Sequence, residues 1–205
     1  MDEKEYLLDP CGTSSLPYWK TEQIKIPAHM AVIRDDHFSA DIYHGADEPY
    51  FKLFHDLKQI EQPALCEPFA FIRCDFPAFA KHINECYAEV GVSSEELCAY
   101  AQRPVYHPEL WVAIRDTQND RIVATGIAEL DTRIGEGILE WIQVSPDYRR
   151  KGLGKALVCE LLQRMKCIAD FVTVSGRVNN PDHPFALYLS CGFKNPVIWH
   201  VIVQK

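Results

Sequence analysis

The stretch PDYRRKGLGKAL, residues 146–157, places three consecutive cations beside two glycines in a chain whose formal net charge is −8. Pro146 cannot donate a backbone hydrogen bond, so it ends the strand-like run before it. From residue 153 onward apolar residues recur at helical spacing. The first N–H groups of a helix lack intrahelical partners and carry partial positive charge. We therefore expect this loop to bind an anion.

The side chains of the loop favour a polyphosphate over a lone carboxylate. Glycine lets an anion approach the backbone without a Cβ in the way. Arginine can grip phosphate oxygens with two parallel hydrogen bonds. The residues predicted to contact the anion are Arg149, Arg150, Lys151, Gly152, Leu153, Gly154 and Lys155.

Two familiar phosphate motifs fit this loop poorly. A Walker P-loop is excluded because Lys155 is followed by Ala156 and the first glycine is missing. A dinucleotide fingerprint would need glycine where Leu157 stands, although Arg177 could serve as an NADP-binding arginine. Only 30 residues follow Ser175, too few for the remaining strand–helix units of a doubly wound sheet. An NADP site is therefore disfavoured.

The pattern on both sides of the loop predicts the order β-α-α-β-β-β-α-β-α-β from residue 67. The three strands expected within residues 109–144 are separated by short polar turns, which indicates an antiparallel meander. Ser93 and Glu96 form a capping box that opens a helix. Other helices are expected over residues 77–90, with a buried stripe that includes Val90, and over residues 153–168, with a stripe that ends at Ile168.

Residues 1–66 are expected to form a distinct αβ extension, and residues 67–205 the main domain. Within the extension, residues 22–33 look strand-like, and Phe51, Phe54 and Leu57 within residues 48–60 have helical spacing. The two prolines in residues 61–68 mark the predicted junction.

Two motifs together resemble a known family. The R-x-x-G-x-G pattern of Arg149, Gly152 and Gly154 is similar to the acyl-CoA-binding motif of the GNAT superfamily of N-acetyltransferases. The segment NNPDHPFALYLSCGF, residues 179–193, resembles that family's Asn…Ala-x-x-Leu-Tyr…Gly-Phe ending. The resemblance covers residues 67–205 and implies an α/β (α+β) fold. In that fold helices flank a central mixed, mostly antiparallel sheet.

The resemblance also implies site residues. Strands 137–144 and 170–175 would splay apart, and the N–H near Gln143 or Val144 would polarise a thioester carbonyl. Tyr188 would protonate the departing thiolate. Pro181 occupies the place of the family's asparagine, so Asn180 or Asn179 is the predicted cofactor contact.

A general base is needed as well, because an alkyl amine arrives protonated at neutral pH. Glu140 lies four residues before Val144, and strand alternation predicts that both residues share one face of the sheet. Glu136 and Glu129 are the other candidates.

The predicted function is transfer of an acetyl group from acetyl-CoA, the co-substrate, to a primary amine of a small-molecule or peptide acceptor. A catalytically silent CoA-binding sensor is the alternative, followed by an NADP-dependent oxidoreductase. A homodimer formed through the C-terminal strand or the N-terminal extension is compatible with the resemblance.

Composition adds further expectations. Histidine and cysteine lack zinc spacing, so no metal is expected, and Cys11 has no assignable histidine partner for nucleophilic catalysis. The acidic net charge disfavours nucleic-acid binding. The apolar runs are too short to span a bilayer, which needs about 20 residues. MDEKEYLLDP, residues 1–10, does not look like a signal peptide, so a cytoplasmic protein is expected.

Overall fold

The computed structural model describes residues 1–87 and 91–204. Across these residues the strands are β1 (Met30–Arg34), β2 (Ala46–His55), β3 (Phe69–Ile72), β4 (Trp111–Asp116), β5 (Arg121–Asp131), β6 (Glu136–Val144), β7 (Phe171–Arg177) and β8 (Lys194–Val203). The helices are α1 (Glu3–Leu8), α2 (Pro10–Thr13), α3 (Tyr18–Thr21), α4 (Phe76–Cys86), α5 (Ser94–Tyr100), α6 (Leu153–Met165) and α7 (Pro184–Ser190). The element order predicted from residue 67 is confirmed.

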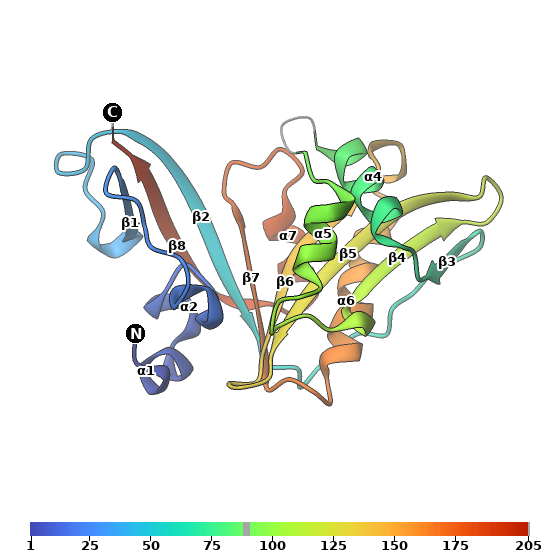
Figure 1. Ribbon diagram of the computed structural model, residues 1–205, viewed down its shortest axis with the longest axis horizontal. Coiled ribbons are helices and arrows are strands. Elements are labelled where there is room, and N and C mark those ends of the chain that lie inside the picture. Colours follow the sequence, from blue (N-terminus) through green and yellow to red (C-terminus); the bar gives the residue numbers. More distant parts are fainter. Residues whose placement is uncertain (88–90, 205) are drawn as a thin grey trace.

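All eight strands belong to one sheet, with the order β1-β8-β2-β7-β6-β5-β4-β3. Every neighbouring pair is antiparallel except β6 and β7. Figure 1 shows α4 and α5 in front of the sheet and α6 behind it. The predicted fold class, a mostly antiparallel mixed sheet flanked by helices, is confirmed.

Two apolar clusters hold these helices to the sheet. Leu157, Leu161 and Met165 of α6 are fully buried in the larger cluster. Phe79 and Ile83 of α4 pack with α5 in the second cluster. The helix expected to run to residue 168 ends at Met165, and Ile168 is exposed, so the prediction that Ile168 is buried is wrong.

Local signals set the start of α4 and α5. The predicted capping box of α5 is present, because Ser93 and Glu96 each accept a hydrogen bond from the other's backbone N–H. Asp75 caps α4, with Pro77 in its first turn. The predicted stripe position Val90 lies outside the described residues.

The helix predicted over residues 48–60 is wrong, because strand β2 occupies most of that range. β2 lies between β8 and β7 and pairs with both. Phe51, Lys52 and Leu53 are consecutive and all fully buried, as expected for a strand covered on both faces. Long-range pairing thus decided the conformation of a segment whose local spacing also fitted a helix. The predicted boundary at residue 66 falls between β2 and β3, and strands from both sides of it share this sheet.

The N-terminal segment, residues 1–21, is fastened to the sheet by two buried charged residues. Glu136 of β6 accepts hydrogen bonds from the Tyr6 hydroxyl at 2.7 Å and the Tyr18 N–H at 3.0 Å. Lys52 of β2 is 1% exposed, and its Nζ donates to the Tyr6 hydroxyl and to the carbonyls of Pro10, Ser14 and Leu16. These bonds place residues 10–20 beside β6 and β7.

Candidate active site

The loop between β6 and α6 has the backbone of an anion site. Gly152 has a φ of +80° and is the N-cap of α6, and no side chain of the described residues caps this helix. A Cβ added at Gly152 would meet no described heavy atom within 4 Å apart from its chain neighbours, so the space beside this N-cap residue is open. The helix start can therefore donate to an anion that the chain itself does not supply.

Two of the basic side chains of the loop form ion pairs with carboxylates, and two others are exposed to solvent. Arg149 donates to Asp182 at 2.6 Å and to the Val144 carbonyl at 3.2 Å, and Lys155 pairs with Glu61 at 2.7 Å. Arg150 and Lys151 are exposed.

The other predicted loop contacts differ in exposure. Leu153 is buried in the core, so only its backbone is available to a ligand. A Cβ at Gly154 would lie 3.3 Å from the Leu187 side chain, which makes this glycine a close contact between α6 and α7.

Strands β6 and β7 diverge beyond the first four residues of β6. Their parallel pairing runs from Glu136 and Phe171 to Leu139 and Val174. Along its other edge β7 pairs with β2 from Val172 to Arg177, and Figure 1 shows β6 and β7 opening as a V. The predicted splay is thus present, and the edge of β6 beyond Leu139 faces the gap.

A β-bulge sits at the opening of this gap. Ile127 of β5 pairs with Trp141 and Ala128 with Leu139, so Glu140 is the extra residue on β6. Glu140 faces the N-terminal segment, where it forms an ion pair with Lys20, whereas Val144 packs in the cluster beneath α6. The prediction that Glu140 and Val144 share one face is wrong, because the extra residue interrupts strict alternation.

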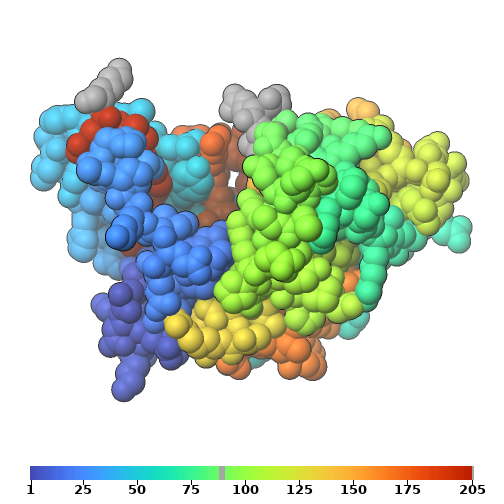
Figure 2. All heavy atoms as spheres, in the orientation of Figure 1, coloured from blue at the N-terminus to red at the C-terminus, as the bar shows by residue number. Residues whose placement is uncertain are grey.

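A cavity of about 280 Å³ lies at the base of the gap. β6 contributes Glu140 and Leu139, β7 contributes Thr173 and Ser175, and the N-terminal segment contributes Lys20. The space-filling view in Figure 2 shows the surface hollowed between the blue and cyan N-terminal part and the green region of α4 and α5. The cavity therefore places a carboxylate and an ammonium group at the base of the gap between β6 and β7.

The two other candidate carboxylates are buried and already bonded. Glu129 accepts hydrogen bonds from Trp19 Nε1 at 3.1 Å and Arg103 at 2.9 Å. Burial and the nearby Glu140 carboxylate raise the pKa of Glu129 to about 7. Burial also raises the pKa of Glu136, which is held by the N-terminal segment and by the Thr173 hydroxyl at 2.6 Å. Of the three carboxylates, Glu140 is the one that lines the cavity.

Tyr188 lies on α7, 6% exposed, against Phe51 and Phe193. Burial, with a further contribution from Tyr87, raises the pKa of its phenol. The phenol is therefore protonated at neutral pH, as an acid must be.

The remaining predicted contacts surround the gap. Gln143 is 5% exposed; its Nε2 donates to Thr125, and its Oε1 has no partner among the described residues. Asn180 is used in its own turn, where its Oδ1 accepts from the Asp182 N–H at 2.9 Å. Asn179 is exposed in the same loop.

Sequence reasoning missed Lys20, whose partner Glu140 is 120 residues away along the chain. The structure buries the neighbouring Trp19 against Val105 and Ile138. Cys11 is buried too, and burial raises the pKa of its thiol to about 12, so it remains a neutral thiol.

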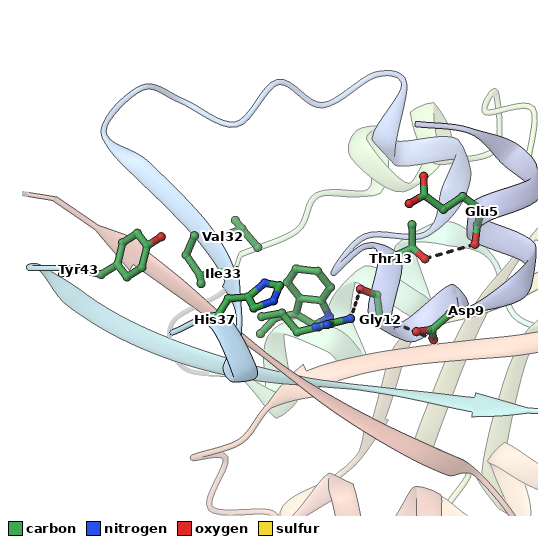
Figure 3. Close-up of a pocket in the computed structure, with 10 residues that line it drawn as sticks. Glu5, Asp9, Gly12, Thr13, Val32, Ile33, His37 and Tyr43 are labelled. Carbon is green, nitrogen blue, oxygen red and sulfur yellow. Dashed lines mark hydrogen bonds between the residues drawn. The ribbon is translucent and has the colours of Figure 1, made fainter. Parts of the chain in front are cut away.

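A second cavity, of about 410 Å³, lies between the helices α1 and α2 and strand β1 (Figure 3). Its charged groups are largely bonded within the chain. Arg34 donates to Asp36 and to the Gly12 carbonyl, and Asp9 accepts from the Gly12 N–H at 2.9 Å. These bonds join the N-terminal helices to β1, and among the described residues the two cavities share no lining residue.

Residues 107–195 match the family model described as acetyltransferase (GNAT) domain. Among solved structures, the chain is similar to a GCN5-related N-acetyltransferase from Sphaerobacter thermophilus, with a TM-score of 0.69, 17% identity, and coverage of 91% of this chain and 64% of that one. A GNAT-family acetyltransferase from Colwellia psychrerythraea gives a TM-score of 0.57, 13% identity, and coverage of 85% and 65%. The ribosomal-protein-S18-alanine N-acetyltransferase from Escherichia coli gives 0.50, 21% identity, and coverage of 67% and 95%.

These structural likenesses concern the fold. No curated protein sequence matches the chain. Within the described residues, no helix combines the length and the apolar character needed to cross a membrane.

Proposed function

Because this chain carries a GNAT acetyltransferase domain on the GNAT fold, we propose that it is an acetyl-CoA-dependent N-acetyltransferase that acts on a primary amine. The observation that carries the proposal is the gap between β6 and β7. The uncapped start of α6 follows β6 on one side of this gap, and a cavity lined by Glu140 lies at its base. A donor with a phosphate handle and a distant thioester fits this arrangement.

The residues present fit acetyl-CoA. The N–H groups at the start of α6, with Arg150 and Lys151, would hold the pyrophosphate. Arg149 would join them by leaving Asp182, which is a partly exposed partner. The free edge of β6 near Gln143 and Val144 would bond the pantetheine amides and the carbonyl oxygen. Acetyl-CoA supplies the activated acetyl group of the reaction.

Glu140 would accept a proton from the substrate ammonium and so free the nitrogen lone pair. The nitrogen then forms a bond to the acetyl carbon as the carbon–sulfur bond breaks, and the nitrogen releases its second proton to water. Tyr188 would donate a proton to the departing thiolate and recover one from solvent. One acetyl amide, one thiol and one net proton result.

Binding and turnover can be tested separately. Thermal unfolding would be followed with acetyl-CoA, CoA and NADPH in separate titrations, because a ligand of the folded state alone stabilises it by RT ln(1 + [L]/Kd). Thiol release from acetyl-CoA in the presence of amines would then report transfer. We expect stabilisation by both CoA species and amine-dependent thiol release. No stabilisation by acetyl-CoA would overturn the proposal.

A catalytically silent CoA sensor is the second candidate, because Glu140 is already paired with Lys20 in the protein without ligands. A sensor would be stabilised by acetyl-CoA and would release no thiol with any amine. An NADP-dependent oxidoreductase would instead be stabilised by NADPH alone.

A further inference from the structure

We propose that the acceptor is a small zwitterionic amine of the α-amino acid class, whose ammonium group binds Glu140 and whose carboxylate binds Lys20. The inference rests on the proposed acetyl transfer and specifies the acceptor for that same site. Its products are the N-acetyl amino acid, free CoA thiol and one proton released to solvent.

The Lys20–Glu140 ion pair is the feature that points to a zwitterion. Both residues line the cavity at the base of the gap, and their side chains are only 18% and 21% exposed. An ammonium ligand that binds Glu140 competes with Lys20 for the carboxylate, and a displaced Lys20 would be left poorly solvated and unpaired. A ligand carrying an ammonium and a carboxylate restores both pairings at once.

The charges around the cavity support the same class. Behind Glu140, the buried Glu129 is paired with Arg103 at 2.9 Å. Each carboxylate of this group thus has one cationic partner, and the group has no surplus of carboxylates over cations. A polyamine would need a surplus of carboxylates, and a nucleotide would need a surplus of cations. A ligand with one charge of each sign matches the arrangement.

The size and the walls of the cavity limit the rest of the acceptor. About 280 Å³ accommodates a small amino acid beside the acetyl group. The walls combine hydroxyl and aliphatic side chains, namely Ser15, Leu16, Ile138, Thr173, Ser175 and Val201. We therefore expect acceptors with small aliphatic or hydroxyl side chains.

The ligand-side experiment needs no substitution. Thiol release from acetyl-CoA would be measured with alanine, valine, serine and threonine, with their methyl esters, and with the corresponding decarboxylated amines. We expect kcat/KM for the free amino acids to exceed that for the esters and amines by at least about tenfold. Equal or better transfer to the esters and amines would overturn the inference.

The matched variant is Lys20→Met, with Lys194→Met as a control, since Lys194 pairs with Asp56 away from the cavity. Lys20→Met should lower kcat/KM for the free amino acids by about tenfold or more. It should not lower kcat/KM for the methyl esters, because Glu140 is then no longer paired with a lysine. A purely structural Lys20 would affect both substrate sets equally, and that result would also overturn the inference.

Failure of this inference can be told from failure of the proposed function. Absence of stabilisation by acetyl-CoA would remove the acetyltransferase itself. Stabilisation by acetyl-CoA with transfer to decarboxylated amines alone, or to none of these acceptors, would overturn only the amino acid assignment.

Discussion

Replacing Lys52 with methionine tests whether the N-terminal segment is held in place by one buried ammonium group. Methionine keeps much of the volume but removes the donors to three backbone carbonyls, those of Pro10, Ser14 and Leu16 at 2.7 to 2.9 Å. A buried acceptor without a donor costs about 1–3 kcal/mol, so the gross loss is about 3–9 kcal/mol. Removing the charge offsets part of this loss. Burial lowers the pKa of Lys52 from 10.5 to about 8, and this cost of burying the ammonium group is equivalent to about 3 kcal/mol.

The net cost is therefore about 0–6 kcal/mol, and its midpoint of about 3 kcal/mol is enough to open residues 1–21 before the rest of the sheet unfolds. Hydrogen exchange would report this opening as lost amide protection in residues 1–21 with protection of β4 to β6 retained. Because the same segment forms one wall of the cavity, KM for the amine should rise while stabilisation by acetyl-CoA stays unchanged.

Lys58→Met is the matched control, since Lys58 is an exposed lysine shortly after β2. It should leave both protection and KM unchanged. Wild-type protection of residues 1–21 in Lys52→Met would refute the reasoning, because the segment would then be held by apolar packing alone.

Three further changes test other parts of the site. Tyr188→Phe should lower kcat by about 10²–10⁴-fold with unchanged stabilisation by acetyl-CoA, and an unchanged kcat would remove Tyr188 as the acid. Gly152→Val should abolish stabilisation by acetyl-CoA, because it strains a φ of +80° and fills open space before α6; retained stabilisation would place the phosphates elsewhere. Because the folded-state pKa of Glu129 is raised to about 7, the wild type should lose stability as pH rises from about 4.5 to 7. Glu129→Gln should therefore gain up to about 2–3 kcal/mol relative to wild type over that range in denaturant titrations, and a constant difference would contradict the shift.

The parts of the fold that sequence predicted are those fixed by local chemistry. Ser93 and Glu96 satisfy N–H groups within one helical turn, so their pattern identifies the start of α5 without any other part of the chain. Pro146 and Gly152 likewise mark where β6 ends and where α6 begins. The loop between them could therefore be predicted as an anion site from a dozen residues.

Residues 48–60 show where the local spacing of apolar residues predicts the wrong secondary structure. The apolar residues Phe51, Phe54 and Leu57 fit a helix, and their neighbours Lys52 and Leu53 do not contradict it until β7 and β8 are placed on either side. A lysine in the buried part of β2 is unexpected from sequence, because the carbonyls that compensate its charge belong to the distant N-terminal segment.

The proposed acceptor cavity could not be predicted from sequence for a related reason. The bulge at Glu140 is defined only by its register against β5, and it turns the carboxylate from the face of Val144 toward the N-terminal segment. Lys20 then meets it across 120 residues of chain. The sheet thus positions the candidate base Glu140, whose carboxylate is paired with Lys20. Lys20 belongs to the N-terminal segment that Lys52 and Glu136 hold to the same sheet. If the proposed acceptor binds Glu140, it competes with Lys20, so specificity should depend on residues 1–21 as much as on the proposed donor site.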